Sequence, residues 1–313
     1  MKVLVTGVAG FIGSHLAEYL SKRGIDVIGV DNFNDYYDSS LKRLNASHIE
    51  ASGVKVIEAD LRDDLSEILP NDFDFVFHFA GQPGISNTTT LKEYVDNNIY
   101  ATENLLQFVK ENNKNLKLFV NIATSSVYGS VANLSETADV KPISYYGITK
   151  FSAEQLVLKA QRMGEIPACS FRLYSVYGPR ERPEKLYTKL IKSIVENKNF
   201  PLYKGSLEHS RSFTYVGDIV EGLAKCIGKE SVCTGEVFNL GSDKEYTTGD
   251  GISLIEKIIG KPAQLEITPP REGDQLKTTA IIDKVYSLLG YAPQTTFEDG
   301  LKAQVDWYMK YFN

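Results

Sequence analysis

The sequence is poor in cysteine and contains no long apolar run. Its three cysteines, Cys169, Cys226 and Cys233, are odd in number and form no C-x-x-C pair. This usage argues against a disulfide framework and favours a reducing cytoplasm. No apolar run approaches the 18 residues that a membrane span needs, so we predict no transmembrane segment. Glycines interrupt the apolar N-terminus and no small-residue cleavage site follows it, which argues against a signal peptide.

Positive charge and metal-ligand spacing are also lacking. The chain has 34 Lys and Arg against 40 Asp and Glu, a formal net charge of −6. A nucleic-acid surface needs a clustered excess of Lys and Arg, so the composition argues against a nucleic-acid partner. The histidines are scattered without metal-ligand spacing, and we predict no metal site. They are His15, His48, His78 and His209.

Short apolar runs rich in β-branched and aromatic residues recur along the first part of the chain, and stretches with helical spacing separate most of them. The runs lie at 2–7, 26–31, 54–60, 73–80, 117–124 and 168–178. Strands that alternate with helices and are apolar throughout predict a parallel sheet covered on both faces. The predicted fold class is therefore α/β, with the doubly wound sheet of the Rossmann fold.

The pattern becomes more irregular after about residue 178, where helix-plus-loop segments replace the regular alternation. We predict a Rossmann domain over 1–177 and a smaller C-terminal substrate-binding domain over 178–313 that caps the carboxyl edge of the sheet. The apolar run at 236–241 can return to the main sheet, so segments near 213–241 are expected to belong to the first domain.

A glycine-rich turn separates the first apolar run from the first helical stretch. Gly7, Gly10 and Gly13 have the spacing G-x-x-G-x-x-G, which lets the backbone approach a pyrophosphate at the helix N-terminus. Asp31 ends the next predicted strand, where a carboxylate accepts hydrogen bonds from the ribose hydroxyls of NAD and repels the 2′-phosphate of NADP. The pattern predicts NAD as the cofactor, and a solvated acid at a strand end is the alternative interpretation of Asp31.

Tyr146 and Lys150 stand four positions apart in "SYYGITK" and share one face if this segment opens a helix. A nearby ammonium favours the phenolate, which would bring the pKa of Tyr146 toward the range of a base near neutral pH. Tyr145 is turned away from that face. We expect Tyr145 to be a packing residue.

A cluster of hydroxyls follows the apolar run at 117–124. Thr124, Ser125 and Ser126 would lie at the carboxyl end of a parallel strand, where folds of this class bind ligands. The alternative for one or two of them is to cap a turn or a helix.

In this combination and order, the motifs resemble the extended short-chain dehydrogenase/reductase family, specifically its nucleotide-sugar epimerases and dehydratases. The resemblance covers essentially the whole chain. Its downstream matches are "YGPR" at 177–180, "RSFTYVGDIV" at 211–220, "FNLGS" at 238–242 and "REGD" at 271–274.

The resemblance implies roles for the polar residues at the predicted strand ends. Tyr146 would be the acid and base at a sugar hydroxyl, Lys150 would bind the nicotinamide ribose and tune Tyr146, and Thr124 would hydrogen-bond the reacting oxygen. The implied cofactor contacts are Gly7, Gly10, Phe11, Ile12, Gly13, Asp31, Asn32, Asp60, Leu61, Phe79, Ala80, Tyr146 and Lys150.

The resemblance also implies how the substrate and a second subunit are bound. Arg211, Arg271 and Asp274 would grip the nucleoside diphosphate, since arginines suit a pyrophosphate and a carboxylate suits a ribose diol. A homodimer is expected through the helices that contain 94–112 and 144–162.

Within the family, three segments look like the UDP-glucuronate 4-epimerase group. They are "GVDNFNDYYDSSLKRLN", "AGQPGIS" and "GPRERPEKL". The chain departs from that group at Ser86, where an arginine is expected, and at Glu184 and Lys185, which replace the usual Asp and Met.

The reaction that the resemblance implies is NAD-dependent 4-epimerisation of UDP-glucuronate to UDP-galacturonate through a transient 4-keto intermediate. Arg182, which lies between two prolines, is expected to bind the C5 carboxylate as a planar fork. Arg180 is expected to support the loop. The hydroxyls expected to orient the same carboxylate are those of Ser125, Ser126 and Ser175.

Three alternatives stay open, and a fourth reaction, 4,6-dehydration, is disfavoured. A 4,6-dehydratase would need an Asp-Glu pair where the chain has Ser125 and Ser126, so this reaction is disfavoured. UDP-glucuronate decarboxylases usually have Glu at the position of Ser126, and epimerases of UDP-glucose or UDP-N-acetylhexosamine have Asn at the position of Ser175. A non-catalytic NAD-binding regulator on the same fold is the non-enzyme alternative.

Overall fold

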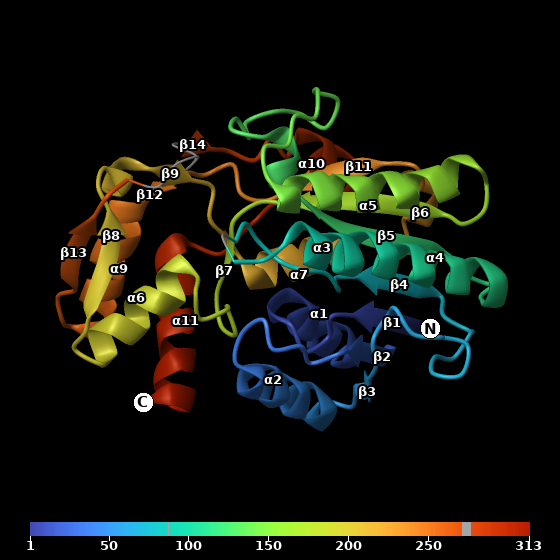
Figure 1. The fold of residues 1–313 in the computed structure, drawn as a ribbon, viewed down its shortest axis with the longest axis horizontal. Helices are drawn as coiled ribbons and strands as arrows, with labels where there is room; N and C mark the ends of the chain where they lie inside the picture. The colour runs from blue at the N-terminus through green and yellow to red at the C-terminus, as the bar shows by residue number, and fades with distance from the viewer. Residues whose placement is uncertain (87, 271–276) are drawn as a thin grey trace.

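A parallel sheet forms the main layer of the protein (Figure 1). In the computed structural model, which describes residues 1–86, 88–270 and 277–313, seven strands have the order β11-β6-β5-β4-β1-β2-β3. The strands are β1 (Lys2–Thr6), β2 (Asp26–Asp31), β3 (Lys55–Glu58), β4 (Phe75–His78), β5 (Leu118–Thr124), β6 (Ala168–Leu173) and β11 (Val237–Leu240). Every neighbouring pair is parallel, which confirms the doubly wound fold predicted from the sequence.

Helices cover both faces of this sheet because its strands are apolar on both sides. Val3 and Val5 of β1 contribute to the core beneath one set of helices, whereas Leu4 between them belongs to the core on the opposite face. The first set is α1 (Phe11–Ser21), α2 (Ser39–Ala51), α7 (Val216–Ala224) and α10 (Asp283–Leu289). The second set is α4 (Ala101–Asn112) and α5 (Tyr145–Arg162).

The apolar run at 168–178 forms two strands rather than one. β6 ends at Leu173, and β7 (Val176–Tyr177) pairs outside the main sheet with β10 (Thr214–Tyr215). The backbone carbonyl of Ser175, between the two strands, accepts a hydrogen bond from the Thr214 N–H at 2.8 Å. Apolar character continues across the break, so the hydrophobic pattern carries no signal of the change in partner.

A second, smaller unit follows β7 and is seen at the left of Figure 1. Its helices are α6 (Leu186–Val195), α9 (Thr248–Ile259) and α11 (Phe297–Phe312), which pack around the parallel pair β8 (Asn199–Tyr203) and β13 (Gln264–Thr268). Between these segments the chain returns to the main layer with α7 and β11. The division at residue 178 stays a prediction.

Short elements complete the chain and connect the layers. They are α3 (Leu91–Val95), the π-helix η1 (Asp96–Tyr100), the 3-10 helices η2 (Ser125–Tyr128) and η3 (Ser206–Glu208), α8 (Glu230–Cys233), β9 (Ser210–Arg211), β12 (Tyr246–Thr247) and β14 (Lys277–Thr278). The π-turn buries Asn98, which bonds the Gln82 backbone and the Thr149 hydroxyl and so ties the loop after β4 to α5. Within the described ranges, no helix has the length and apolar character to cross a membrane.

Candidate active site at the carboxyl edge of the sheet

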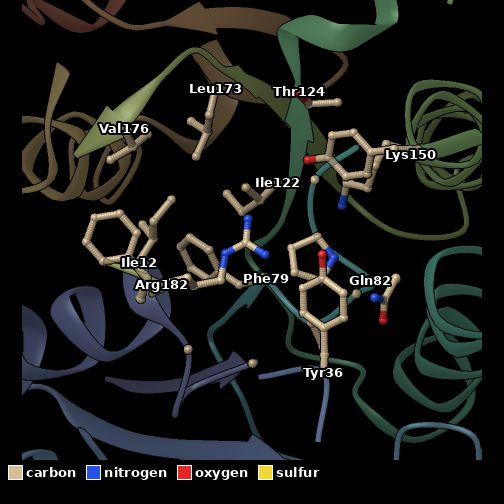
Figure 2. Close-up of a pocket in the computed structure, with 18 of the residues that line it drawn as sticks. Ile12, Tyr36, Phe79, Gln82, Ile122, Thr124, Lys150, Leu173, Val176 and Arg182 are labelled. Carbon is tan, nitrogen blue, oxygen red and sulfur yellow. The ribbon is translucent and has the colours of Figure 1, made fainter. Parts of the chain in front are cut away.

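A cavity of about 650 Å³ lies where the carboxyl ends of the strands face the smaller unit (Figure 2). Each site residue predicted from the sequence lies on its wall wherever the structure describes that residue. These residues are Gly7, Gly10, Phe11, Ile12, Gly13, Asp31, Asn32, Asp60, Leu61, Phe79, Ala80, Thr124, Ser125, Ser126, Tyr146, Lys150, Ser175, Arg182 and Arg211. Arg271 and Asp274 lie outside the described residues.

The glycine turn brings the N-terminus of α1 against the end of β1. Gly7 has φ +67°, and a Cβ there would come within 2.8 Å of the Ala80 nitrogen. A Cβ on Gly13 would clash with the carbonyl oxygen of Gly7, so only glycine permits this close packing. Gly10 gives α1 no side-chain cap and its first turn holds no acidic residue. The unpaired N–H groups and positive end of α1 therefore fit a pyrophosphate.

Asp31 ends β2 on the same wall and is held by the backbone. Its carboxylate accepts hydrogen bonds from the N–H groups of Ala9 at 3.1 Å and Phe33 at 2.9 Å. Burial raises the pKa of Asp31, and the charge of Lys42 opposes this. Lys42 reaches the wall from α2 and donates to the side-chain oxygen of Asn34 at 2.7 Å. This geometry fits a ribose diol, with a carboxylate acceptor and an ammonium donor close together.

Asp60 and Asn32 border the same end of the cavity as members of one network. The Asn32 amide donates to Asp60 at 2.9 Å, and Arg62 donates to the same carboxylate through two nitrogens at 2.8 and 2.7 Å. The Arg62 hydrogen bonds hold the pKa of Asp60 below its usual range, against desolvation. Asp60 is therefore a fixed anion beside the ribose end of the wall.

Tyr146 and Lys150 project from the first turns of α5, which begins at Tyr145, where Ser144 caps it by accepting from the Gly147 N–H at 3.1 Å. Tyr145 is 54% exposed and does not pack as predicted. Tyr145 is the first residue of α5, and its side chain is exposed instead of packing against the sheet.

The pKa of Tyr146 is raised because burial disfavours the phenolate. A hydrogen bond with Thr124 and the charge of Arg182 act in the opposite direction. Burial also lowers the pKa of Lys150 to about 8, and the charge of Glu154 opposes this. The sequence predicts a tyrosine pKa lowered by the lysine, whereas desolvation is the dominant effect on both groups without a ligand. Figure 2 shows Thr124 and Lys150 on the same side of the cavity.

A buried ion pair lies directly behind Lys150. Glu154 follows Lys150 by one turn of α5 and accepts hydrogen bonds from Arg172 of β6 at 2.6 and 3.0 Å. Both side chains are buried, and Arg172 also donates to the Tyr128 hydroxyl at 2.9 Å. Because Glu154 is fully satisfied by a neighbouring strand, its charge is held in a fixed position relative to the ammonium.

The hydroxyl cluster at 124–126 both caps a helix and lines the cavity, the two roles considered from the sequence. Thr124 caps η2, since its hydroxyl oxygen accepts from the Ser126 N–H at 3.2 Å, and it also lies 3.2 Å from the Ser126 hydroxyl. Thr124, Ser125, Ser126 and Ser175 nevertheless all lie on the cavity wall. Capping therefore fixes the direction of the Thr124 hydroxyl without removing it from the site.

Arg182 reaches into the cavity but already has neighbours. One guanidinium nitrogen lies 2.7 Å from a carboxylate oxygen of Glu184, and the guanidinium carbon lies 5.7 Å from the ring centre of Tyr36. In Figure 2 the Arg182 guanidinium and the Tyr36 hydroxyl both point toward the centre of the cavity. Arg182 is therefore oriented by an anion and an aromatic ring before any ligand enters.

Arg180 points the other way and holds the loop. It has φ +66°, and its guanidinium donates to Glu18 of α1 at 2.7 Å. The carbonyl of Pro179 bonds His15 of the same helix at 2.8 Å. The loop that carries Arg182 is thus fastened to α1 by Pro179 and Arg180.

Comparison with known proteins agrees with this geometry. The model of the NAD dependent epimerase/dehydratase family matches residues 3–241. The chain belongs to this family. Among relatives of this epimerase-family protein, an uncharacterized UDP-glucose epimerase of Bacillus subtilis (strain 168), YtcB, is 36% identical over 311 residues, 97% of each chain.

Two further relatives of the epimerase-family protein bear UDP-glucuronate in their names. UDP-glucuronate 4-epimerase 3 of Arabidopsis thaliana is 35% identical over 99% of this chain and 77% of its own. The crystal structure of UDP-glucuronic acid 4-epimerase from Bacillus cereus, in complex with UDP-glucuronic acid and NAD, has a TM-score of 0.90 and 35% identity, covering 100% of both chains.

Several wall residues of this family member were not assigned a role from its sequence. They include Tyr36, Lys42, Gln82, Glu184, Lys185 and Thr278. Lys42 carried one usable signal, because it falls on the buried face of α2 with the apolar residues Leu41, Ala46 and Ile49. Tyr36 and Gln82 lie in irregular segments, where sequence spacing does not indicate which way a side chain points.

Proposed function

We propose that this protein catalyses the NAD-dependent interconversion of UDP-glucuronate and UDP-galacturonate by epimerisation at C4. The observation that carries the proposal is one cavity that is lined by the glycine turn and Asp31, by Thr124, Tyr146 and Lys150, and by the inward-pointing Arg182. The Bacillus cereus relative, solved with UDP-glucuronic acid and NAD, supports the same assignment.

The residues that would hold NAD lie along one side of the cavity. The N-terminus of α1 would bind the pyrophosphate and Asp31, with Lys42 beside it, would bind the adenosine ribose. When bound, NAD would take up the hydride from C4 of the sugar and later return it to the opposite face.

Tyr146 would move the proton in both half-reactions. Its buried phenol is neutral in the resting protein because desolvation raises its pKa. Removal of the proton from the sugar 4-hydroxyl needs the phenolate, which the Thr124 hydrogen bond and the charges of Arg182 and Lys150 favour. Return of the proton needs the phenol, which burial favours. These opposing effects suit a group that must act as both base and acid.

The sugar would lie between the hydroxyl cluster and Arg182. A guanidinium matches a carboxylate as two planar groups with paired donors and acceptors. The hydroxyls of Ser125, Ser126 and Ser175 would orient the same carboxylate. Arg211, together with Arg271 and Asp274 from outside the described residues, would bind the nucleoside diphosphate.

Epimerisation of UDP-glucose is the second candidate, because Glu184 already neutralises Arg182 and the Bacillus subtilis relative is named a UDP-glucose epimerase. A panel of UDP-sugars, resolved by NMR, separates the candidates. UDP-galacturonate from UDP-glucuronate supports the proposal, a UDP-pentose indicates decarboxylation, and turnover of UDP-glucose alone refutes the uronate assignment.

The Arg182→Leu variant tests the carboxylate contact within the same panel. Loss of charge-assisted hydrogen bonds should lower kcat/KM for UDP-glucuronate by at least about 10-fold, while any residual turnover of UDP-glucose serves as the internal control. An equal loss for both sugars would assign Arg182 a structural role.

The assembly and compartment of the protein are also proposals. We expect a homodimer through α4 and α5, supported by exposed apolar side chains at Tyr100, Tyr145 and Ile148 on this side of the molecule. Sedimentation equilibrium would test it. Three free, buried cysteines support a reducing cytoplasm.

A further inference from the structure

His78 ends β4 and is completely buried, and each of its ring nitrogens faces a threonine hydroxyl. Nδ1 lies 2.7 Å from the Thr6 hydroxyl of β1, and Nε2 lies 2.9 Å from the Thr102 hydroxyl of α4. Burial lowers the pKa of His78 to about 3, and the charge of Lys150 acts in the same direction. The ring is therefore neutral at physiological pH, with one N–H donor and one acceptor.

The partners of Thr102 decide which ring nitrogen carries the proton. The Thr102 hydroxyl donates its single proton to the Asn98 backbone carbonyl at 2.7 Å, so its oxygen must accept from His78. Nε2 therefore carries the ring proton, and Nδ1 accepts from the Thr6 hydroxyl. The Thr6 oxygen in turn accepts from the Ala80 N–H at 3.1 Å. One continuous hydrogen-bond chain thus runs from the Ala80 N–H through His78 to the Asn98 carbonyl.

The two ends of this hydrogen-bond chain hold the loop at 79–82, which follows β4 and lines the cavity (Figure 2). Ala80 is bound at one end. At the other end, the side-chain oxygen of Asn98 accepts from the Gln82 N–H at 2.8 Å. A Cβ on Gly81, between these two contacts, would come within 2.6 Å of the same Asn98 oxygen. The loop is therefore packed closely between β1 and η1 and is fixed at both of its ends.

We propose that His78 is a positioning residue for the cofactor and acts through the loop at 79–82. His78 and Thr102 lie outside the cavity wall that the described residues form, whereas the loop is part of it. The loss of any member of the chain would leave a buried donor or acceptor unsatisfied and weaken the hold on Ala80. A loop that is fixed before binding spares the ligand the cost of ordering it. The proposal rests on the proposed function only in taking NAD as the ligand.

NAD binding to the cofactor-free full chain, measured by calorimetry, tests this role through Thr102. Thr102→Val has a similar shape but lacks the hydroxyl, so the Nε2–H of His78 loses its acceptor. This variant should bind NAD about 10-fold more weakly. Thr102→Ser keeps the hydroxyl and should bind NAD like the wild type. Equal affinities of Thr102→Val and the wild type would overturn the proposal.

Asn113→Ala is the matched control for a general loss of stability. Asn113 is also buried, and its amide donates to the Phe73 carbonyl at 2.9 Å, just before the opposite end of β4. Its removal should lower the melting temperature, as Thr102→Val does, but should leave the NAD affinity unchanged. If both variants lose affinity in proportion to stability, the role of His78 is only structural and the proposal fails. If the wild type binds NAD but converts no UDP-sugar, the proposed function fails while this inference stands.

The position of the ring proton provides a measurement on the wild type itself. Nitrogen NMR distinguishes a protonated ring nitrogen from a bare one, and the spectrum of His78→Gln identifies the signals of His78. The chain requires the proton on Nε2 at neutral pH. Thr102→Val should move it to Nδ1, because a buried N–H without an acceptor is costly. A wild-type ring with its proton on Nδ1, or with two protons, would overturn the proposal.

Discussion

The buried ammonium of Lys150, although proposed to serve catalysis, should lower the free energy of unfolding of the protein. Its side chain is 7% exposed, and burial lowers its pKa from 10.5 to about 8. This is a loss of proton affinity of more than a hundredfold, and each tenfold loss corresponds to about 1.4 kcal/mol. The buried ammonium therefore costs the folded state about 3 kcal/mol at neutral pH. Lys150→Met keeps an unbranched apolar side chain of similar length, so it should recover much of that free energy.

The sign of the effect gives it a recognisable pH dependence. Below pH 8 the lysine is protonated in both the folded and the unfolded chain, so the full cost is present. Between pH 8 and 10.5 the folded protein releases the proton while the unfolded chain keeps it, and the stability of the wild type rises with pH. Lys150→Met lacks this gain. The advantage of the variant should be constant below pH 8 and should shrink as pH increases toward 10.5.

Urea unfolding of both proteins without cofactor, followed by circular dichroism between pH 6.5 and 10, measures this difference. Other titrating groups, including Lys185, are present in both proteins and cancel. A free energy of unfolding that is higher in Lys150→Met by about 2–3 kcal/mol below pH 8, with loss of turnover, agrees with the reasoning. A variant that is less stable, or whose difference from the wild type does not change with pH, would refute it.

Two further substitutions test the neighbours of Lys150. Tyr146→Phe should lower kcat by about 10²-fold or more, because it removes the acid and base, while UDP binding stays near the wild-type value; near-normal turnover would contradict the proton-transfer role. Glu154→Gln should lower the free energy of unfolding by about 3–5 kcal/mol, since it leaves the Arg172 guanidinium buried without its anion. The double variant Glu154→Leu/Arg172→Met should regain most of this loss in urea unfolding, and additive losses would argue against a coupled pair.

The main sheet could be predicted from the sequence because its signals are local. A parallel sheet buried on both faces needs apolar runs such as the one that contains Val3 to Val5, and the Rossmann turn needs glycine where a Cβ would clash. Such requirements restrict residue type at fixed spacing. The positions of Gly7, Gly13 and Asp31 at the strand ends followed from the pattern.

The details of the site depend on long-range contacts that spacing does not encode. Tyr145 and Tyr146 are adjacent and chemically identical, yet the first is exposed and the second lies in the cavity. The direction of the Tyr146 pKa shift depends on burial, which outweighs the hydrogen bond with Thr124 and the charge of Arg182. Arg182 and Glu184 are close in sequence. The contact of Arg182 with Tyr36, however, forms only because folding brings together two loops that are far apart in the sequence.

Charged and polar groups on the cavity wall explain how an acidic protein could bind two anionic ligands. The net charge of −6 gives no general attraction for nucleotides. The anions Asp31 and Asp60 line the cavity together with the cations Arg182, Lys185 and Arg211; Lys42 lies close to Asp31, and Arg62 pairs with Asp60. The Asp31 carboxylate can accept hydrogen bonds from ribose hydroxyls, the N-terminus of α1 suits the pyrophosphate of a dinucleotide, and the arginines suit a diphosphate or a uronate. Under the proposed function, these fixed groups would help to place the dinucleotide and the UDP-sugar so that their reacting groups meet at Tyr146.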